Sequence, residues 1–77
     1  MKNIERISDH EYLIELIERI QTNERNINSY KDSQLTFHQI DAPHLVAKYQ
    51  LKIDLKRVMN KLLKEHYNSY LQTIKQF

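Results

Sequence analysis

The side chains that could do chemistry in this 77-residue chain are carboxylates, imidazoles and amines, because the chain contains no cysteine. Glu11, Glu15 and Glu18 are four and three residues apart, so a helix would place them side by side as an acid–base array or a cation site. No histidine or other ligand lies at a matching offset from them. We therefore expect a solvated acidic face, whose functional use would be contact with the basic surface of a partner.

The four histidines could ligate zinc in principle, but no two of them lie three or four residues apart. The chain also lacks glycine, which phosphate-binding loops, dinucleotide-binding loops and nucleophile elbows require. No nucleophile, metal cluster or cofactor loop can be assembled from what remains. We expect neither a metal nor a cofactor, and no enzymatic activity.

Opposite charges are concentrated in the two halves of the chain. Residues 1–41 hold five Lys and Arg against eight Asp and Glu, and residues 42–77 hold seven Lys and Arg against two acids. The halves therefore carry −3 and +5, although the whole chain carries only +2. This asymmetry indicates either an anionic partner for the second half or an attraction between the halves, within one chain or in a head-to-tail dimer.

The elements that must position these residues are expected to be helices in one small domain, residues 1–77. A chain of this length has room for a single core. Tight hairpin turns and most helix C-caps use glycine, so its absence favours an all-α fold over a sheet. No apolar run approaches the roughly 18 residues of a membrane-spanning helix, and we find no secretory signal, so we expect a soluble cytoplasmic protein.

The first helix is expected to begin after Ser8, because Ser8 and Glu11 have the spacing of a capping box. Weak helix formers fill residues 22–33, so this helix is predicted to end between Arg25 and Lys31. Its apolar residues share one face, opposite the glutamates: Leu13, Leu16, Ile17 and Ile20.

An extended connector and a second helix start are predicted next. Over residues 32–41, apolar and polar side chains partly alternate, and Leu35, Phe37 and Ile40 are expected to reach the core. Pro43 suits the first turn of a helix, where its missing amide would be unpaired, and Asp41 or the residue after it supplies the cap.

The apolar residues after Pro43 occupy two faces of a helix. One face holds Leu45, Val46, Tyr49 and Ile53, and the other, rotated by more than roughly 100°, holds Leu51, Leu55, Val58, Met59 and Leu62. Either the helix breaks near residues 50–54, or it stays whole and is buried on two different sides. Asp54 is a good N-cap residue, so we predict the break and a three-helix domain with a long C-terminal helix.

The stretch from Leu45 to Leu62 resembles a helix-turn-helix motif, with a small residue in the first helix, Ile53 in the turn and Asp54 as the cap of the second helix. It departs from the motif because it has no turn glycine and one extra residue in the turn. The resemblance implies contact between the second helix and double-stranded DNA through amine, guanidinium and amide side chains: Lys52, Lys56, Arg57, Asn60, Lys61 and Lys64. The alternative is that these residues only keep the helix soluble or face a partner.

The C-terminal tail repeats apolar residues at the 4, 3, 4, 3 spacing of a coiled-coil seam. Two heptads are too few to be stable alone, so the seam must pack on another element. We predict a homodimer interface there, with packing on the first helix as the alternative. The predicted interface comprises Leu63, His66, Tyr67, Tyr70, Ile74 and Phe77.

Two functions are compatible with these features. The first is a small DNA-binding transcription regulator of the kind that bacteria and mobile elements encode, acting through the helix-turn-helix-like segment. The alternative is a helical protein–protein interaction module, such as an inhibitor or adaptor, acting through its acidic first helix or its aromatic C-terminal helix. Affinity for duplex DNA at low salt would separate the two.

Overall fold

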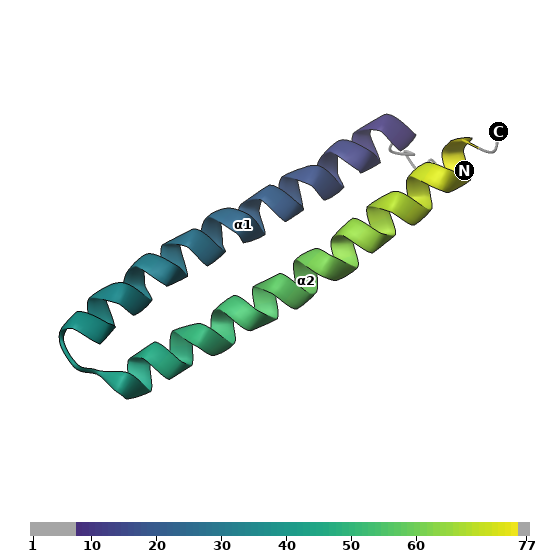
Figure 1. The fold of residues 1–77 in the computed structure, drawn as a ribbon. Coiled ribbons are helices and arrows are strands. Elements are labelled where there is room, and N and C mark those ends of the chain that lie inside the picture. The colour runs from purple at the N-terminus through teal and green to yellow at the C-terminus, as the bar shows by residue number, and fades with distance from the viewer. Residues whose placement is uncertain (1–7, 76–77) are drawn as a thin grey trace, which may run out of the picture.

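The structure, a computed structural model, describes residues 8–75 as a helical hairpin. Helix α1 (Asp9–Gln39) and helix α2 (Pro43–Lys75) run antiparallel and are joined by a short turn (Figure 1). The predicted all-α fold is confirmed, but the predicted count of three helices is wrong, because the described residues form two.

Helix α1 begins where the capping box predicted. The Ser8 hydroxyl accepts a hydrogen bond from the Glu11 amide at 3.1 Å. The same hydroxyl donates to the Glu11 carboxylate at 3.1 Å, so Glu11 reaches the cap side chain rather than the cap amide. Asp9 and Glu11 also place negative charge in the first turn, which favours this end of the helix dipole.

The prediction that α1 ends between Arg25 and Lys31 is wrong, because the helix continues to Gln39. Packing on α2 holds the weak helix formers in helical conformation. The Phe37 ring lies 5.4 Å from the Tyr49 ring of α2. The predicted extended connector is therefore helical.

Only one of the three residues expected to plug the core from that connector does so. Phe37 is half-buried, but Leu35 is 59% exposed and Ile40 is 64% exposed. Apolar and polar side chains alternated too briefly to distinguish a strand from a helix with one buried face.

The turn between the helices is built without glycine. The Asp41 amide donates to the His38 carbonyl at 3.1 Å, and the Ala42 amide donates to the Phe37 carbonyl at 2.8 Å, the bond pattern of a Schellman motif. Asp41 occupies the left-handed position with φ 59°, where aspartate is among the few residues other than glycine that are tolerated. Pro43 is then the first residue of α2, as predicted.

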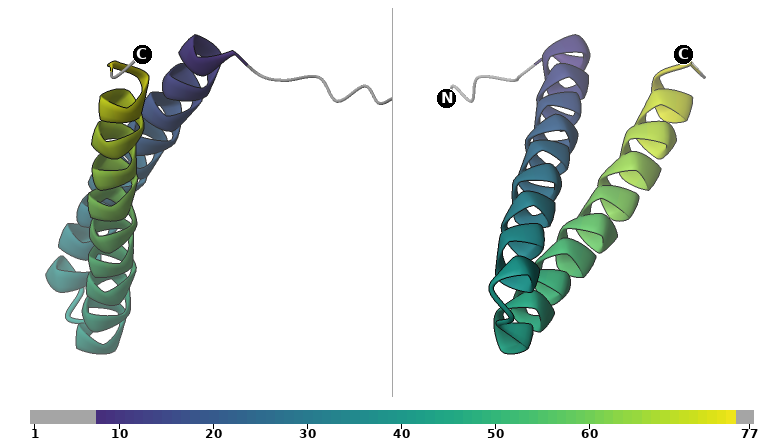
Figure 2. Two further views of the ribbon diagram at one scale, coloured as in Figure 1. Left: turned by 90° about the vertical axis from the view of Figure 1, so that its right-hand side faces the viewer. Right: turned by 60° about the vertical axis from the view of Figure 1, so that its left-hand side comes forward.

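The predicted break in α2 is wrong, and so is the helix-turn-helix geometry that depended on it. Residues 50–54 are helical, and both views of Figure 2 show α2 running unbroken. Ile53, expected in a turn, is the most deeply buried side chain described, at 1% exposure. Because α1 extends to Gln39, it covers the first turns of α2 as well as the later ones. The helix stays whole, as in the alternative, but only the face that holds Ile53 is buried, and the face that holds Leu55 is exposed.

The two helices pack along a heptad-like seam. Every residue at its 4–3 spacing is buried or half-buried. In α1 the seam comprises Leu16, Ile20, Asn23, Ile27, Tyr30, Gln34 and Phe37. In α2 it comprises Val46, Tyr49, Ile53, Lys56, Asn60, Leu63, Tyr67, Tyr70 and Ile74.

The core along this seam is thin. Among the described residues, the buried apolar side chains are Leu16, Ile27 and Ile53. The hairpin is a single layer with a radius of gyration of 17.7 Å, whereas a compact domain of this length would have about 11 Å. Much of α2 is therefore left uncovered on the side that faces away from α1.

Candidate interaction surface

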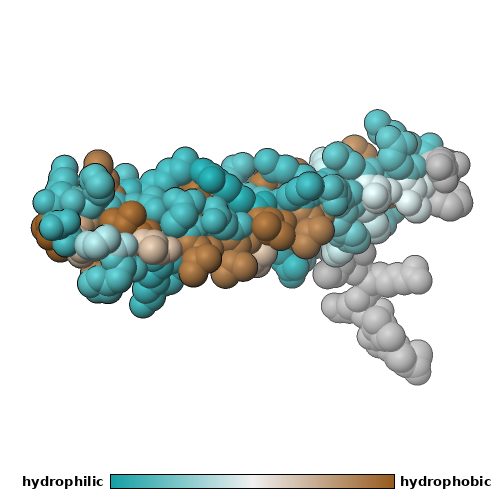
Figure 3. Space-filling view, turned by 60° about the horizontal axis from the view of Figure 1, so that its bottom comes forward, coloured by the Kyte–Doolittle hydropathy of each residue, from teal (hydrophilic) through white to brown (hydrophobic). Residues whose placement is uncertain are grey.

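A row of large apolar side chains lies exposed along the outer face of α2. We call it the α2 stripe; it comprises Leu51, Leu55, Val58, Met59 and Leu62, which are 66%, 64%, 56%, 46% and 59% exposed. At 100° per residue the row is rotated by about 140° from the seam, so α1 cannot cover it. Figure 3, which brings the α2 side forward, shows apolar side chains gathered there between hydrophilic ones.

The C-terminal end of the α2 stripe borders an open groove of about 600 Å³ between the two helices. Met59, Leu62 and Leu63 supply its apolar wall, and Glu15 and Glu18 of α1 stand on its opposite side. The remaining lining residues are Arg19, Thr22, Asn23 and His66. An apolar strip beside an acidic rim is suited to an apolar partner that carries basic side chains.

An aromatic cluster near the turn holds the first half of α2 against α1. The Tyr49 ring lies 5.7 Å from the Tyr30 ring and 5.4 Å from the Phe37 ring. The Lys52 ammonium lies 4.9 Å from the Tyr49 centroid and 5.5 Å from the Tyr30 centroid, so the rings attract its charge.

A pair of buried amides crosses the middle of the seam. Asn23 Nδ2 donates to Asn60 Oδ1 at 2.8 Å, and Asn60 Nδ2 donates to the Ile20 carbonyl at 3.2 Å. Both asparagines are 6% exposed. Lys56 Nζ also donates to Asn23 Oδ1, at 3.4 Å.

A second aromatic cluster joins the free ends of the helices. The Tyr12 ring lies 4.8 Å from the Tyr70 ring, and its hydroxyl lies 2.7 Å from His66 Nε2. The Tyr70 hydroxyl donates to Asp9 at 2.5 Å. This hydrogen bond to the Asp9 carboxylate, with some desolvation, raises the pKa of Tyr70 above 10.0.

The structure separates the six residues predicted to bind DNA into two groups. Lys52, Lys56 and Asn60 lie at the contact with α1, through the tyrosine rings and the asparagine pair, and Asn60 is buried. The other three, Arg57, Lys61 and Lys64, are exposed.

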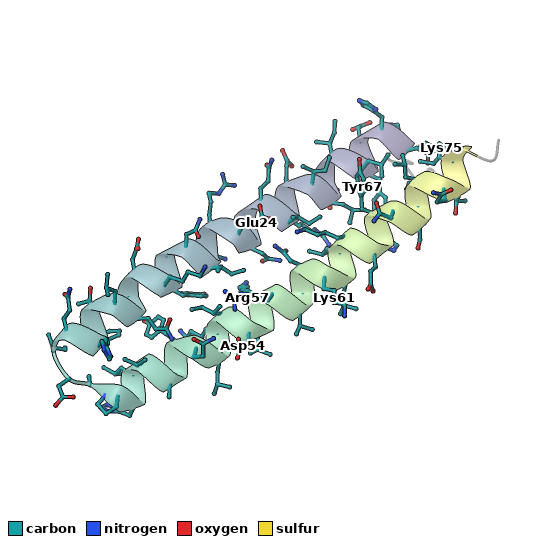
Figure 4. The ribbon with its side chains drawn as sticks, viewed as in Figure 1. Glu24, Asp54, Arg57, Lys61, Tyr67 and Lys75 are labelled. Carbon is teal, nitrogen blue, oxygen red and sulfur yellow. The ribbon has the colours of Figure 1, made fainter. Side chains whose placement is uncertain are left out.

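The three exposed cations line a second open groove of about 460 Å³. Two acids also line it: Glu24, which lies 3.7 Å from Lys64, and Glu65. Figure 4 labels Glu24, Arg57 and Lys61.

The structure places the predicted homodimer seam largely against α1. Leu63, Tyr67, Tyr70 and Ile74 are half-buried along the hairpin seam, and His66 is exposed but bonded to Tyr12. Phe77 lies outside the described residues. The tail therefore takes the alternative role that its spacing allowed, packing on the first helix.

The acidic face of α1 is on the surface, as its spacing predicted. Glu11 bonds to the helix cap, Glu15 pairs with Arg19 at 3.0 Å, and Glu18 is exposed. Among residues 8–75, no three His, Asp or Glu side chains come close enough together to hold a metal ion.

The sequence pattern placed the residues of the α2 stripe on one face of a helix but did not predict that this face is exposed. The helix-turn-helix resemblance implies that Val58 and Leu62 face inward, from the second helix of the motif, but both are exposed. The rotation between the two apolar faces could have revealed this exposure. An unbroken helix that packs one of these faces on a partner leaves the other pointing away from it.

No protein-family model matches this chain, and comparisons with curated proteins and with solved structures find no match to it. Over the part of the chain that the structure describes, neither helix is long and apolar enough to cross a membrane.

Proposed function

We propose that this chain is a helical protein–protein interaction module that binds its partner through the α2 stripe. The observation that carries the proposal is the exposure of five large apolar side chains, each 46–66%, along one face of a single helix. Large contiguous apolar patches on small proteins mark sites of association. The spacing of these residues is that of a helix which docks in an apolar groove or a bundle.

The hairpin presents the α2 stripe on a rigid support. The asparagine pair and the two aromatic clusters fix the rotation of α2 about its own axis, so the stripe is oriented before binding. Preorganisation reduces the entropy lost on association. Covering an exposed leucine contributes about 1 kcal/mol or more, so five such residues make a substantial surface.

Photo-crosslinking from the stripe tests the proposal. A benzoylphenylalanine at Val58 should form protein adducts in cells, whereas the same group at Gln21, an exposed residue of α1, should form few. The two sites differ in what surrounds them and not in the reactive group. If position 58 gave no more protein adduct than position 21, the stripe would not be an interaction surface.

DNA binding is a second candidate, favoured by the exposed cations Arg57, Lys61 and Lys64 on neighbouring turns of α2. A phosphate-binding surface of this kind predicts duplex affinity that falls steeply with added salt. An Arg57→Glu, Lys61→Glu variant should lose that affinity while keeping its helicity. Fluorescence anisotropy without any duplex binding at low salt would remove this candidate.

A further inference from the structure

We propose that the partner on the α2 stripe is a second copy of this chain, docked antiparallel about a twofold axis that crosses the middle of α2. The inference rests on the proposed function and names its partner. The product would be a four-helix arrangement of two hairpins.

The spacing of the stripe is symmetric, as a twofold interface requires. Residues 51, 55, 58 and 62 are separated by 4, 3 and 4 residues, so their centre lies between Lys56 and Arg57. An antiparallel copy sets Leu51 opposite Leu62, and Leu55 opposite Val58. Each of these four residues in one copy therefore meets an apolar residue of the other, and Met59 lies beside them on the flank that borders the groove.

Charges on one flank of the stripe complement each other under the same axis. Asp54 and Lys61, both labelled in Figure 4, are one heptad apart, so helical periodicity places them on the same side of the stripe. The twofold axis brings Asp54 of each copy within about 3 Å, along the helix axis, of the level of Lys61 in the other. Two opposite-charge pairs form, one at each end of the interface, whereas a parallel dimer would place this flank of the two copies on opposite sides and would form neither pair.

The other flank of the stripe adds a further charge match. The groove beside Met59 and Leu62 carries Glu15, Glu18 and Arg19 on its α1 rim; Arg19 pairs with Glu15, so Glu18 is the carboxylate that a further cation can meet. In the antiparallel arrangement, the first half of the second copy's α2 runs past this rim and brings the exposed Lys48 to it. The acidic and basic halves of the chain thereby face each other between copies.

The hairpin alone has only a thin core, and a second copy on the stripe would enlarge the apolar area that is buried. The stripe offers on the order of 400 Å² per copy, or about 800 Å² for two copies. Specific interfaces begin at roughly 1,000 Å², so the arrangement requires the polar flanks to contribute the remaining area. Each hairpin alone buries three apolar side chains among its described residues, which is little for a chain of this size.

Light scattering across a concentration series tests the inference on the full chain. We expect a particle of twice the 9.4 kDa of one chain. Leu62→Asp should weaken the dimer by about tenfold or more, because it buries a carboxylate in the interface. Leu35→Asp is the matched control, since Leu35 and Leu62 are both 59% exposed and only Leu62 belongs to the stripe. Circular dichroism should show unchanged helicity in both variants.

Disulfide formation tests the antiparallel orientation, because the chain has no cysteine of its own. A mixture of Leu51→Cys chains with Leu62→Cys chains should form a mixed disulfide dimer under mild oxidation. Neither variant alone should do so efficiently, since each thiol then faces an apolar side chain. A parallel dimer would crosslink each variant with itself and would overturn the arrangement.

Three results would overturn the inference: a monomer at millimolar concentration, a dimer that survives Leu62→Asp, or equal loss in Leu35→Asp. The proposed function fails separately, through the crosslinking at Val58. Adducts there with a different protein, together with a monomeric chain, would keep the interaction module and discard the second copy as its partner.

Discussion

At the residue scale, the Asn23–Asn60 pair sets the register of the hairpin. Each amide is 6% exposed and finds its partner on the opposite helix or its backbone. Sliding one helix by a turn would leave both amides buried without hydrogen-bond partners. The free-energy cost of two such groups is larger than the cost of pairing apolar side chains that fit less well. A polar pair at one seam position is a known way to specify the alignment of two helices.

Removing one asparagine should therefore be worse than removing both. Asn60→Leu leaves Asn23 without its partner and should lower the free energy of unfolding by about 1–3 kcal/mol. The Asn23→Leu, Asn60→Leu double variant should recover most or all of that loss while allowing alternative registers. Urea denaturation measures the free energies. A double variant as unstable as the sum of the single ones would contradict the role given to the pair.

Tyr70 makes the stability of the free ends sensitive to alkali. Its hydrogen bond to Asp9 raises the pKa of the phenol above 10.0, so folding favours the neutral phenol. The contribution is fully present below pH 10 and is lost as the pH rises through the folded-state pKa.

Asp9→Ala should move the pKa of Tyr70 down toward 10.0, because it removes the acceptor and its charge. Carbon NMR of the tyrosine rings follows this residue separately from the other four tyrosines. Tyr30, which has no contact with Asp9, is the internal control. An unchanged Tyr70 titration would show that the hydrogen bond does not persist in solution.

At the element scale, the continuity of α2 decides which face of the chain is available. Had the helix ended near Gln50, the residues from Leu55 onward could have rotated to bury the stripe against α1. An unbroken helix fixes the angle between its two apolar phases, so covering Ile53 exposes Leu55.

A proline at residue 55 distinguishes the two structures. In a helix-turn-helix capped by Asp54, residue 55 would be the first helical position, where proline is tolerated. In the continuous helix, Leu55→Pro removes an internal hydrogen bond and should cost about 3 kcal/mol or more. Leu55→Ala is the control, since it removes the same side chain without affecting the backbone. Thermal unfolding in which both variants behaved alike would restore the predicted break.

At the scale of the whole molecule, a one-layer hairpin with a thin core is expected to gain stability by association. If two copies share the α2 stripe, folding and dimerisation are linked, and the unfolding temperature rises with protein concentration. The dependence should be present in the unmodified chain and in Leu35→Asp. The concentration dependence should be absent in Leu62→Asp, because this variant cannot form the dimer interface. Calorimetry over a hundredfold range of concentration measures it, and a constant unfolding temperature in the unmodified chain would argue for a stable monomer.

Local chemistry determined much of this protein from sequence alone. The all-α class, the start at Ser8, the start at Pro43 and the solvated glutamate face follow from capping, proline geometry and helical periodicity, which act within a few residues. The two apolar phases of the second half were also visible in the sequence.

Tertiary structure alone decided how those phases are used. The extension of α1 to Gln39, the unbroken α2 and the burial of Asn60 all depend on contacts between residues more than 30 positions apart or on opposite helices. Local helix propensity favoured a connector and a break. It does not include the packing against a partner helix, which stabilises a weak helix along its whole length. That partner covers one face of α2 and leaves the α2 stripe open.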